Sequence, residues 1–173
     1  MQLETERLWI IPLSAKQLSL WTCDIPALER ELQCAYQGEP VEGIFRDIVK
    51  GQAEKTAQDE ANCLYHTFWF LVRKADRVVV GSADFKNVPD QREEVEIGYG
   101  LGKDFEGRGY MTEAVRAMCA WALGQRGVSS VIAETEKNHF ASQNVLRRCG
   151  FALYRQEETH WWRLSNAPVI TGD

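Results

Sequence analysis

Residues 98–115 read GYGLGKDFEGRGYMTEAV, and this stretch decides which fold and which kind of ligand the sequence predicts. It follows a strand-like run, EEVEI, and leads into residues whose apolar side chains recur at helical spacing. Two glycines, Gly107 and Gly109, therefore lie where a strand gives way to a helix. Because the start of a helix has unpaired N–H groups and partial positive charge, such a turn can receive an anion such as pyrophosphate. A tight turn without any ligand is the structural alternative.

The residues around this turn do not match the common nucleotide-binding motifs. A dinucleotide-binding fold needs G-x-G-x-x-G after the first strand of a βαβ unit, and a P-loop needs G-K followed by Ser or Thr. Here Thr112 stands at the third glycine position, and no lysine follows Gly109. The turn thus predicts another anionic cofactor, and a nucleotide-binding domain is an alternative that rests on the glycines alone.

Hydrophobic periodicity predicts the elements on either side of the turn. Before it, we expect a strand from residue 6 to Pro12, a helix at 15–23 capped by Ser14, two or three helices between Asp24 and Asn62, and antiparallel strands at 66–74, 77–85 and 93–101. After it, we expect a helix at about 109–125, a strand at 129–135, a helix at 139–150, two strands within 151–164 and a loose tail at 165–173.

The composition is that of one globular domain, so we expect residues 1–173 to form a single domain. Of its residues, 45% are hydrophobic and 26% are charged, and the formal net charge is −5. This charge provides no broad basic surface for nucleic acid, and no apolar run is long enough for a membrane span, so we expect a cytoplasmic protein without either partner. Five scattered cysteines, without a C-x-x-C pair or a ligand spacing to histidine, predict free thiols and no metal.

A second motif follows at residues 134–151, ETEKNHFASQNVLRRCGF. Together with residues 98–115 it resembles the GNAT superfamily of acyl-CoA N-acyltransferases. The opening ETERLWIIPLS, at residues 4–14, is similar to the RimJ/RimL-like branch of ribosomal-protein N-terminal acetyltransferases. The resemblance implies an α/β (α+β) GNAT fold, with a central mixed, mostly antiparallel sheet flanked by helices. It also implies acetyl-CoA as the co-substrate.

The resemblance assigns the glycine turn to the cofactor. In the family, the signature Q/R-x-x-G-x-G/A forms a loop whose backbone amides bind the pyrophosphate of acetyl-CoA. The signature falls on residues 106–111, where Glu106 replaces Gln or Arg and Met111 replaces a small residue. The implied pyrophosphate loop comprises Glu106, Gly107, Arg108, Gly109, Tyr110, Met111 and Thr112. The Arg108 guanidinium could add a charge-assisted contact to phosphate, and a solvated surface arginine is the alternative.

The strand before the turn is implied to hold the pantetheine arm. Alternation puts Val95, Ile97, Tyr99 and Leu101 on one face and Glu94, Glu96, Gly98 and Gly100 on the other. The resemblance implies that the backbone from Tyr99 to Leu101 pairs with pantetheine like an added strand, and that a nearby N–H polarises the thioester carbonyl. The two glycines suit a closely approached strand.

Acetyl transfer needs a neutral amine, so a base that removes the ammonium proton is useful. A lysine-type amine has a pKa of about 10.4 and a terminal amine about 8. Glu96, just before the pantetheine segment, is the first candidate for this base, acting through a water. Its structural alternative is a salt bridge. Glu134 is the second candidate, and Glu136 is expected to be a loop residue.

The second motif supplies a group for the departing thiolate. It resembles the family pattern N-x-x-S-x-x-V-L-x-K-x-G-F, which implies that Ser142 hydrogen-bonds the CoA sulfur; helix capping is its alternative role. Asn138 is assigned a pantetheine contact although it lies one position early, since His139 occupies the family's asparagine slot. Leu146 stands where many relatives carry a general-acid tyrosine, so no tyrosine acid is expected there.

The sequence thus predicts an acetyl-CoA-dependent N-acetyltransferase that works by direct transfer in a ternary complex, as a monomer or homodimer. The amine acceptor stays open between a protein N-terminus and a small molecule. A non-catalytic acyl-CoA-binding or sensing module is the alternative, motivated by the imperfect signature and by Leu146. The aromatic residues around the implied acceptor side are expected to be mostly core: Trp21, Phe45, Trp69, Trp161 and Trp162.

Overall fold

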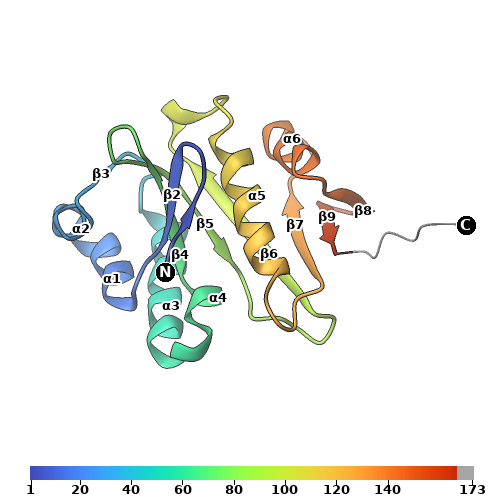
Figure 1. The fold of residues 1–173 in the computed structure, drawn as a ribbon, viewed down its shortest axis with the longest axis horizontal. Helices are drawn as coiled ribbons and strands as arrows, with labels where there is room; N and C mark the ends of the chain where they lie inside the picture. Colours follow the sequence, from blue (N-terminus) through green and yellow to red (C-terminus); the bar gives the residue numbers. More distant parts are fainter. Residues whose placement is uncertain (167–173) are drawn as a thin grey trace, which may run out of the picture.

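The computed structural model describes residues 1–166, which form one mixed sheet with helices packed against it (Figure 1). The strands lie in the order β1-β2-β4-β5-β6-β7-β9-β8, and β3 pairs with β5 off this path. Within these residues, only β3 with β5 and β6 with β7 pair in parallel, which confirms the expected mostly antiparallel sheet. The strands are β1 (Leu3–Glu4), β2 (Leu8–Pro12), β3 (Ala35–Tyr36), β4 (Phe68–Arg73), β5 (Val78–Phe85), β6 (Glu94–Leu101), β7 (Ser130–Thr135), β8 (Ala152–Gln156) and β9 (His160–Ser165).

The α-helices of the described chain form two groups. In Figure 1, α1 to α4 gather on one side of the molecule, and α5 and α6 on the other. The helices are α1 (Ala15–Cys23), α2 (Ile25–Leu32), α3 (Gly43–Gln58), α4 (Cys63–His66), α5 (Tyr110–Leu123) and α6 (Phe140–Arg148). Short 3-10 turns occupy Glu60–Asn62 and Lys103–Phe105, the latter between β6 and α5.

Side-chain alternation in the central strands divides the core into two clusters. In β4, Trp69 and Leu71 pack with α5, whereas Phe68, Phe70 and Val72 pack with α1 to α3. Both sets are buried, because a strand between two helical layers has no solvent-facing side. The sheet is therefore a rigid platform on which β6 and the start of α5 are fixed.

The chain up to the end of β4 follows the expected pattern, with two departures. Ser14 caps α1 in a capping box with Gln17, as expected. The strand expected at 66–74 begins only at Phe68, because α4 ends at His66. The two-residue strands β1 and β3 have no counterpart among the expected elements, because two residues are too few to carry a periodicity.

The C-terminal end corrects the expected tail. Ser165 is the last residue of β9, and the N–H of Asn166 donates to the carbonyl of Ser129 at 3.2 Å. The start of the expected loose segment is therefore bonded to the sheet. The remainder of that segment, residues 167–173, lies outside the described residues.

Strands β6 and β7 separate halfway along β6. Their parallel pairing joins Glu94–Glu96 to Ser130–Ile132, and no pairing continues beyond it in the described chain. Strand β7 instead pairs with β9 along its whole length. From Ile97 to Leu101, β6 is thus bonded on one side only, to β5, and its other edge is open.

Close packing against β5 holds β6 in place and so determines the position of its open edge. Glycine substitutions test this packing. A Cβ atom at Gly81 would lie 2.3 Å from the carbonyl oxygen of Gly100, so the two strands would have to shift. We expect Gly81→Ala to lower the free energy of unfolding by about 1–3 kcal/mol. Gly51→Ala, in α3 with nothing within 4 Å of the added atom, should instead raise it by about 0.5–1 kcal/mol. Urea unfolding measures both, and a neutral Gly81→Ala would contradict the packing described.

Candidate active site

The turn from β6 into α5 presents a series of unpaired backbone donors. Gly107 and Gly109 have φ angles of 75° and 81°, in the left-handed region that favours glycine. Gly109 begins α5 without a side-chain cap, and within residues 1–166 no acceptor is found for the N–H groups of residues 107–112. The hydroxyl of Thr112 is also buried without a hydrogen-bond partner there. Such a set of aligned donors fits an anionic group.

A cavity of about 500 Å³ connects this turn to the open edge of β6 and to α6. It brings together seven of the ten sequence-predicted cofactor residues: Tyr99, Leu101, Glu106, Gly107, Gly109, Met111 and Thr112. The side chains of Arg108, Tyr110 and Asn138 do not line it. His139 lines the cavity, whereas the sequence suggested Asn138. Arg148 also lines it. Because Arg148 follows Ala141 by seven residues, about two helical turns, the two lie on one face of α6, and this spacing could be read from the sequence.

The backbone of β6 offers hydrogen bonds to this cavity. The N–H of Gly102 donates to Val80 at 2.7 Å, and the carbonyl of Glu96 accepts from the N–H of Lys86 at 2.8 Å, so these even-numbered residues bond toward β5. Because backbone groups alternate along an antiparallel strand, the N–H and C=O of Tyr99 and Leu101 point to the open edge. These two residues are the ones that the resemblance implies for pantetheine.

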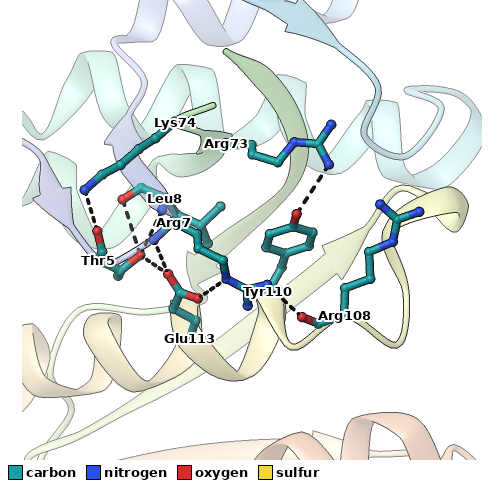
Figure 2. Close-up of polar contacts among 8 residues, drawn as sticks. All are labelled: Thr5, Arg7, Leu8, Arg73, Lys74, Arg108, Tyr110 and Glu113. Carbon is teal, nitrogen blue, oxygen red and sulfur yellow. Dashed lines mark hydrogen bonds and ion pairs between the residues drawn. The ribbon is translucent and has the colours of Figure 1, made fainter. Parts of the chain in front are cut away.

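Figure 2 shows how the turn is fastened to the N-terminal hairpin. The Arg7 guanidinium donates to the carbonyl of Arg108 at 2.9 Å and to the Glu113 carboxylate at 2.8 Å, while its plane covers the ring of Tyr110. The backbone N–H of Arg7 and the hydroxyl of Thr5 donate to the same carboxylate. Burial acts to raise the pKa of Glu113, but these hydrogen bonds have the larger combined effect, so the pKa lies below its usual value. Glu113 in the first turn of α5 is therefore ionised and neutralised by Arg7.

The ring of Tyr110 belongs to this fastening and not to the cavity. It is buried, and its hydroxyl accepts from Arg73 at 3.3 Å. Tyr110 could be assigned to the loop from the sequence, whereas Arg7 could not, because a contact across 101 residues leaves no local pattern.

Ser142 lies at the junction of the site. It is buried on α6, and its hydroxyl is 2.8 Å from the hydroxyl of Tyr99. Helix α6 begins at Phe140 with His139 as its N-cap residue and has no side-chain cap, so capping, the alternative role for Ser142, is not the one found. Burial raises the pKa of Tyr99 to about 12, which keeps the phenol protonated. When Tyr99 donates to Ser142, the proton of Ser142 is free to point into the cavity.

A second cavity, of about 440 Å³, shares Tyr99, Gly100, His139 and Ser142 with the first. Glu39 lines both cavities, and its carboxylate lies over Gly100. Burial, and to a smaller extent repulsion from Glu106, raises the pKa of Glu39. The second cavity is acidic: four carboxylates line it against one lysine, namely Glu39, Asp84, Glu134 and Glu136 against Lys86. Of the five aromatic candidates, only Phe45 lines it; Trp21, Trp69 and Trp162 are core.

The candidate bases differ in their surroundings. Glu96 forms an ion pair with Lys86 at 3.1 Å and lines neither cavity, as its structural alternative predicts. Glu134 and Glu136 line the second cavity, and Glu134 accepts from Thr159 at 2.7 Å. Asp84, which the sequence analysis did not identify, also lines it and is buried. Its signal was a single acid in VVVGSADF, a strand that is otherwise apolar or small.

The family is established by sequence comparison. The model of the acetyltransferase (GNAT) domain matches residues 8–152. The chain belongs to the GNAT acetyltransferase family. An uncharacterized N-acetyltransferase, YjdG of Bacillus subtilis, is 28% identical to this GNAT chain over 164 residues, covering 88% of this chain and 97% of that protein. This confirms the resemblance and the expectation of an acyltransferase enzyme from a family that uses acetyl-CoA.

Solved structures support the fold. The ribosomal-protein-S5-alanine acetyltransferase of Vibrio fischeri superposes on this acetyltransferase with a TM-score of 0.70 at 16% identity, over 96% of this chain and 97% of that one. RimL, a ribosomal L7/L12 α-N-protein acetyltransferase in complex with coenzyme A, gives a TM-score of 0.69 at 13% identity, over 95% and 98%. The GNAT fold expected from the sequence is confirmed.

Two further observations concern metals and membranes. Within residues 1–166, no group of three or more His, Cys, Asp or Glu side chains is arranged to hold a metal ion. In the same part of this acetyltransferase, no helix has the length and apolar character to cross a bilayer.

Substitution of Arg7 tests whether the fastening orders the turn. We expect Arg7→Ala to weaken CoA binding by about 10- to 150-fold, which corresponds to the roughly 1.5–3 kcal/mol of a hydrogen bond to a charged group. The physical reason is that the Arg108 peptide loses its anchor and Glu113 is left as an uncompensated anion. Binding of pantetheine, which lacks the diphosphate, should change little. Calorimetry with both ligands measures this. The control is Arg126→Ala, because Arg126 is exposed and forms no side-chain hydrogen bond or ion pair within residues 1–166. Equal losses for both ligands would contradict the assignment.

Proposed function

We propose that this protein is an acetyl-CoA-dependent N-acetyltransferase that moves an acetyl group directly to a primary amine in a ternary complex. The observation that carries the proposal is the position of the open β6 edge. It connects a cavity with an anion-binding turn to a second, acidic cavity, and both share Tyr99, Gly100 and Ser142. Two substrates could therefore meet at this edge without a covalent enzyme intermediate.

Each part of the first cavity has a role in binding acetyl-CoA. The unpaired amides of residues 107–112 and the hydroxyl of Thr112 would hold the diphosphate. Arg148 lines this cavity and would supply positive charge to the phosphates, and Arg108, within the turn, is proposed as a charge-assisted phosphate contact. The outward N–H and C=O groups of Tyr99 and Leu101 would pair with the pantetheine amides as an added strand does. Asn138 is retained as a proposed pantetheine contact at the start of α6.

The hydroxyl of Ser142 would donate to the departing sulfur, which acetyl-CoA supplies as the leaving thiolate. Tyr99 would orient this hydroxyl by donating to its oxygen. Because Leu146 stands where many relatives carry a general-acid tyrosine, no acid is proposed at that position. Glu96 is the base proposed from the sequence.

The acceptor would occupy the second cavity. Its four carboxylates suit a positively charged amine, either a protein N-terminus or a small molecule. RimL and the S5 acetyltransferase are named for acceptors that are ribosomal proteins, and this chain shares their fold. The cytoplasm is part of the proposal, because the five cysteines are free thiols, which suit a reducing compartment. A monomer or a homodimer is proposed.

A non-catalytic acyl-CoA-binding module is the second candidate. The observations that favour it are the acidic Glu106 at the start of the turn and the absence of a tyrosine at Leu146. Acetyl transfer to any amine would contradict it.

Ligand-dependent thermal unfolding tests the proposed cofactor. With acetyl-CoA, CoA, ATP and NAD added separately, we expect acetyl-CoA and CoA alone to raise the unfolding temperature. A ligand at 100 times its dissociation constant adds about 2.7 kcal/mol to the free energy of unfolding. If neither acetyl-CoA nor CoA raises the unfolding temperature, the use of acetyl-CoA is contradicted. A rise with ATP or NAD alone would support a nucleotide-binding domain.

A further inference from the structure

Asp84 is a buried carboxylate that the structure leaves without a partner. Only 8% of its surface is exposed, and within residues 1–166 it has neither a side-chain hydrogen bond nor an ion pair. The carboxylate lines the second cavity. Burial of an unpaired ionisable group is costly, so a carboxylate in this position calls for a ligand that compensates it.

The backbone around Asp84 brings it to the open edge of β6. In the sheet register, Asp84 of β5 lies opposite Gly98 of β6, next to the residues expected to bind pantetheine. Its Oδ1 atom is 2.9 Å from the point where a Cβ of Gly98 would be, so a side chain there would push it away. Ser142, the proposed donor to the leaving sulfur, lines the same cavity.

The charged groups near Asp84 leave it available as a base. Burial raises its pKa to about 6, against the opposing effect of Lys86 and with a further increase from Glu96. Lys86 is itself engaged by Glu96 at 3.1 Å. The other titratable groups facing the cavity are Glu39, Tyr99, Glu134, Glu136 and His139, so the carboxylates of the lining favour a cation. At pH 7 to 8 Asp84 is ionised and can accept a proton.

We propose that, within the acetyl transfer proposed above, Asp84 binds the ammonium group of a cationic primary amine and takes the proton that must leave before the nitrogen attacks. This inference depends on the proposed function, and it assigns the role of base to Asp84 in place of Glu96. The Glu96 carboxylate is held by Lys86 and lines neither cavity, whereas Asp84 faces the acceptor without a competing partner.

The ammonium nitrogen gives one proton to the Asp84 carboxylate and regains its electron pair. The nitrogen forms a bond to the acetyl carbonyl carbon, and the carbon–sulfur bond breaks with its electron pair on sulfur. The thiolate receives a proton from the Ser142 hydroxyl. The new amide nitrogen then loses its second proton to the Ser142 oxygen, which restores the hydroxyl. Asp84 then releases its proton to solvent.

Substitution by asparagine tests the role of Asp84 in turnover. With 1,4-diaminobutane, lysine amide and an alanine-initiated tetrapeptide as acceptors, we expect Asp84→Asn to lower kcat/KM by about 10²- to 10⁴-fold, the usual contribution of a positioned base. The rise of kcat/KM through about pH 6 should disappear in this variant. Acetyl-CoA binding should be unchanged. Asp47→Asn, on the exposed face of α3, is the matched control.

The pH dependence of stability separates this role from a structural one. The pKa of Asp84 is higher in the folded chain than in the unfolded chain, so its ionisation above pH 6 destabilises the fold. Asp84→Asn should therefore raise the unfolding temperature at pH 8, by about 2–4 °C for each kcal/mol relieved. The gain should fade as the pH falls through 6 toward 4. A structural carboxylate would give a loss at pH 8.

Calorimetry with 1,4-diaminobutane provides a readout that does not need turnover. The wild-type complex with CoA should bind the diamine, and Asp84→Asn should lose at least tenfold in affinity. The inference is overturned if wild type transfers acetyl and Asp84→Asn keeps the wild-type rate and the rise of kcat/KM through about pH 6. It is also overturned if this rise disappears in Glu96→Gln and not in Asp84→Asn. Equal diamine affinity in wild type and Asp84→Asn, or no affinity in wild type, also overturns it. Failure of the wild type to bind acetyl-CoA would instead contradict the proposed function.

Discussion

Three of the eight residues of β6 pair with β7, and the rest of that edge is free of backbone partners in the described chain. Unpaired strand groups are costly when buried and invite pairing when exposed, so proteins usually cover them. Here the pairing of β7 with β9 keeps β7 away, while the close packing of Gly81 on Gly100 holds β6 against β5. Both cavities exist because of this separation, and the backbone of Tyr99 and Leu101 faces the opening.

The same region balances negative and positive charge around a turn suited to an anion. Glu106 and Glu113 lie at the start of α5, where their charge would oppose a diphosphate. Arg7 neutralises Glu113 through a hydrogen-bonded ion pair and also holds the Arg108 peptide. In the second cavity the balance is reversed, because its carboxylates outnumber Lys86. The two ends of the site thus differ in the charge they favour, an anion at the turn and a cation at Asp84.

Local pattern was sufficient to predict much of this arrangement. Ser14 identified the capped start of α1, alternation in residues 93–101 placed Ile97 on the correct face, and Gly107 and Gly109 marked the start of α5. The features that the sequence analysis did not identify depend on contacts distant in the chain. Arg7 contacts Glu113 across 106 residues of sequence, and the register of β5 with β6 places Asp84 opposite Gly98, where it lines the second cavity. Glu96 had the right strand and a plausible spacing, but its ion pair with Lys86 depends on how two strands are aligned.

Amide hydrogen exchange measured by NMR, with and without CoA, tests the central claim most directly. If the open edge of β6 and the turn into α5 hold the cofactor, exchange should slow at the amides of Tyr99 and Leu101 and across residues 107–112 when CoA binds. The amides of Gly98 and Gly100, which already face β5, should change little. Binding of CoA with unchanged exchange at Tyr99, Leu101 and residues 107–112, and protection in another part of the chain, would contradict the account.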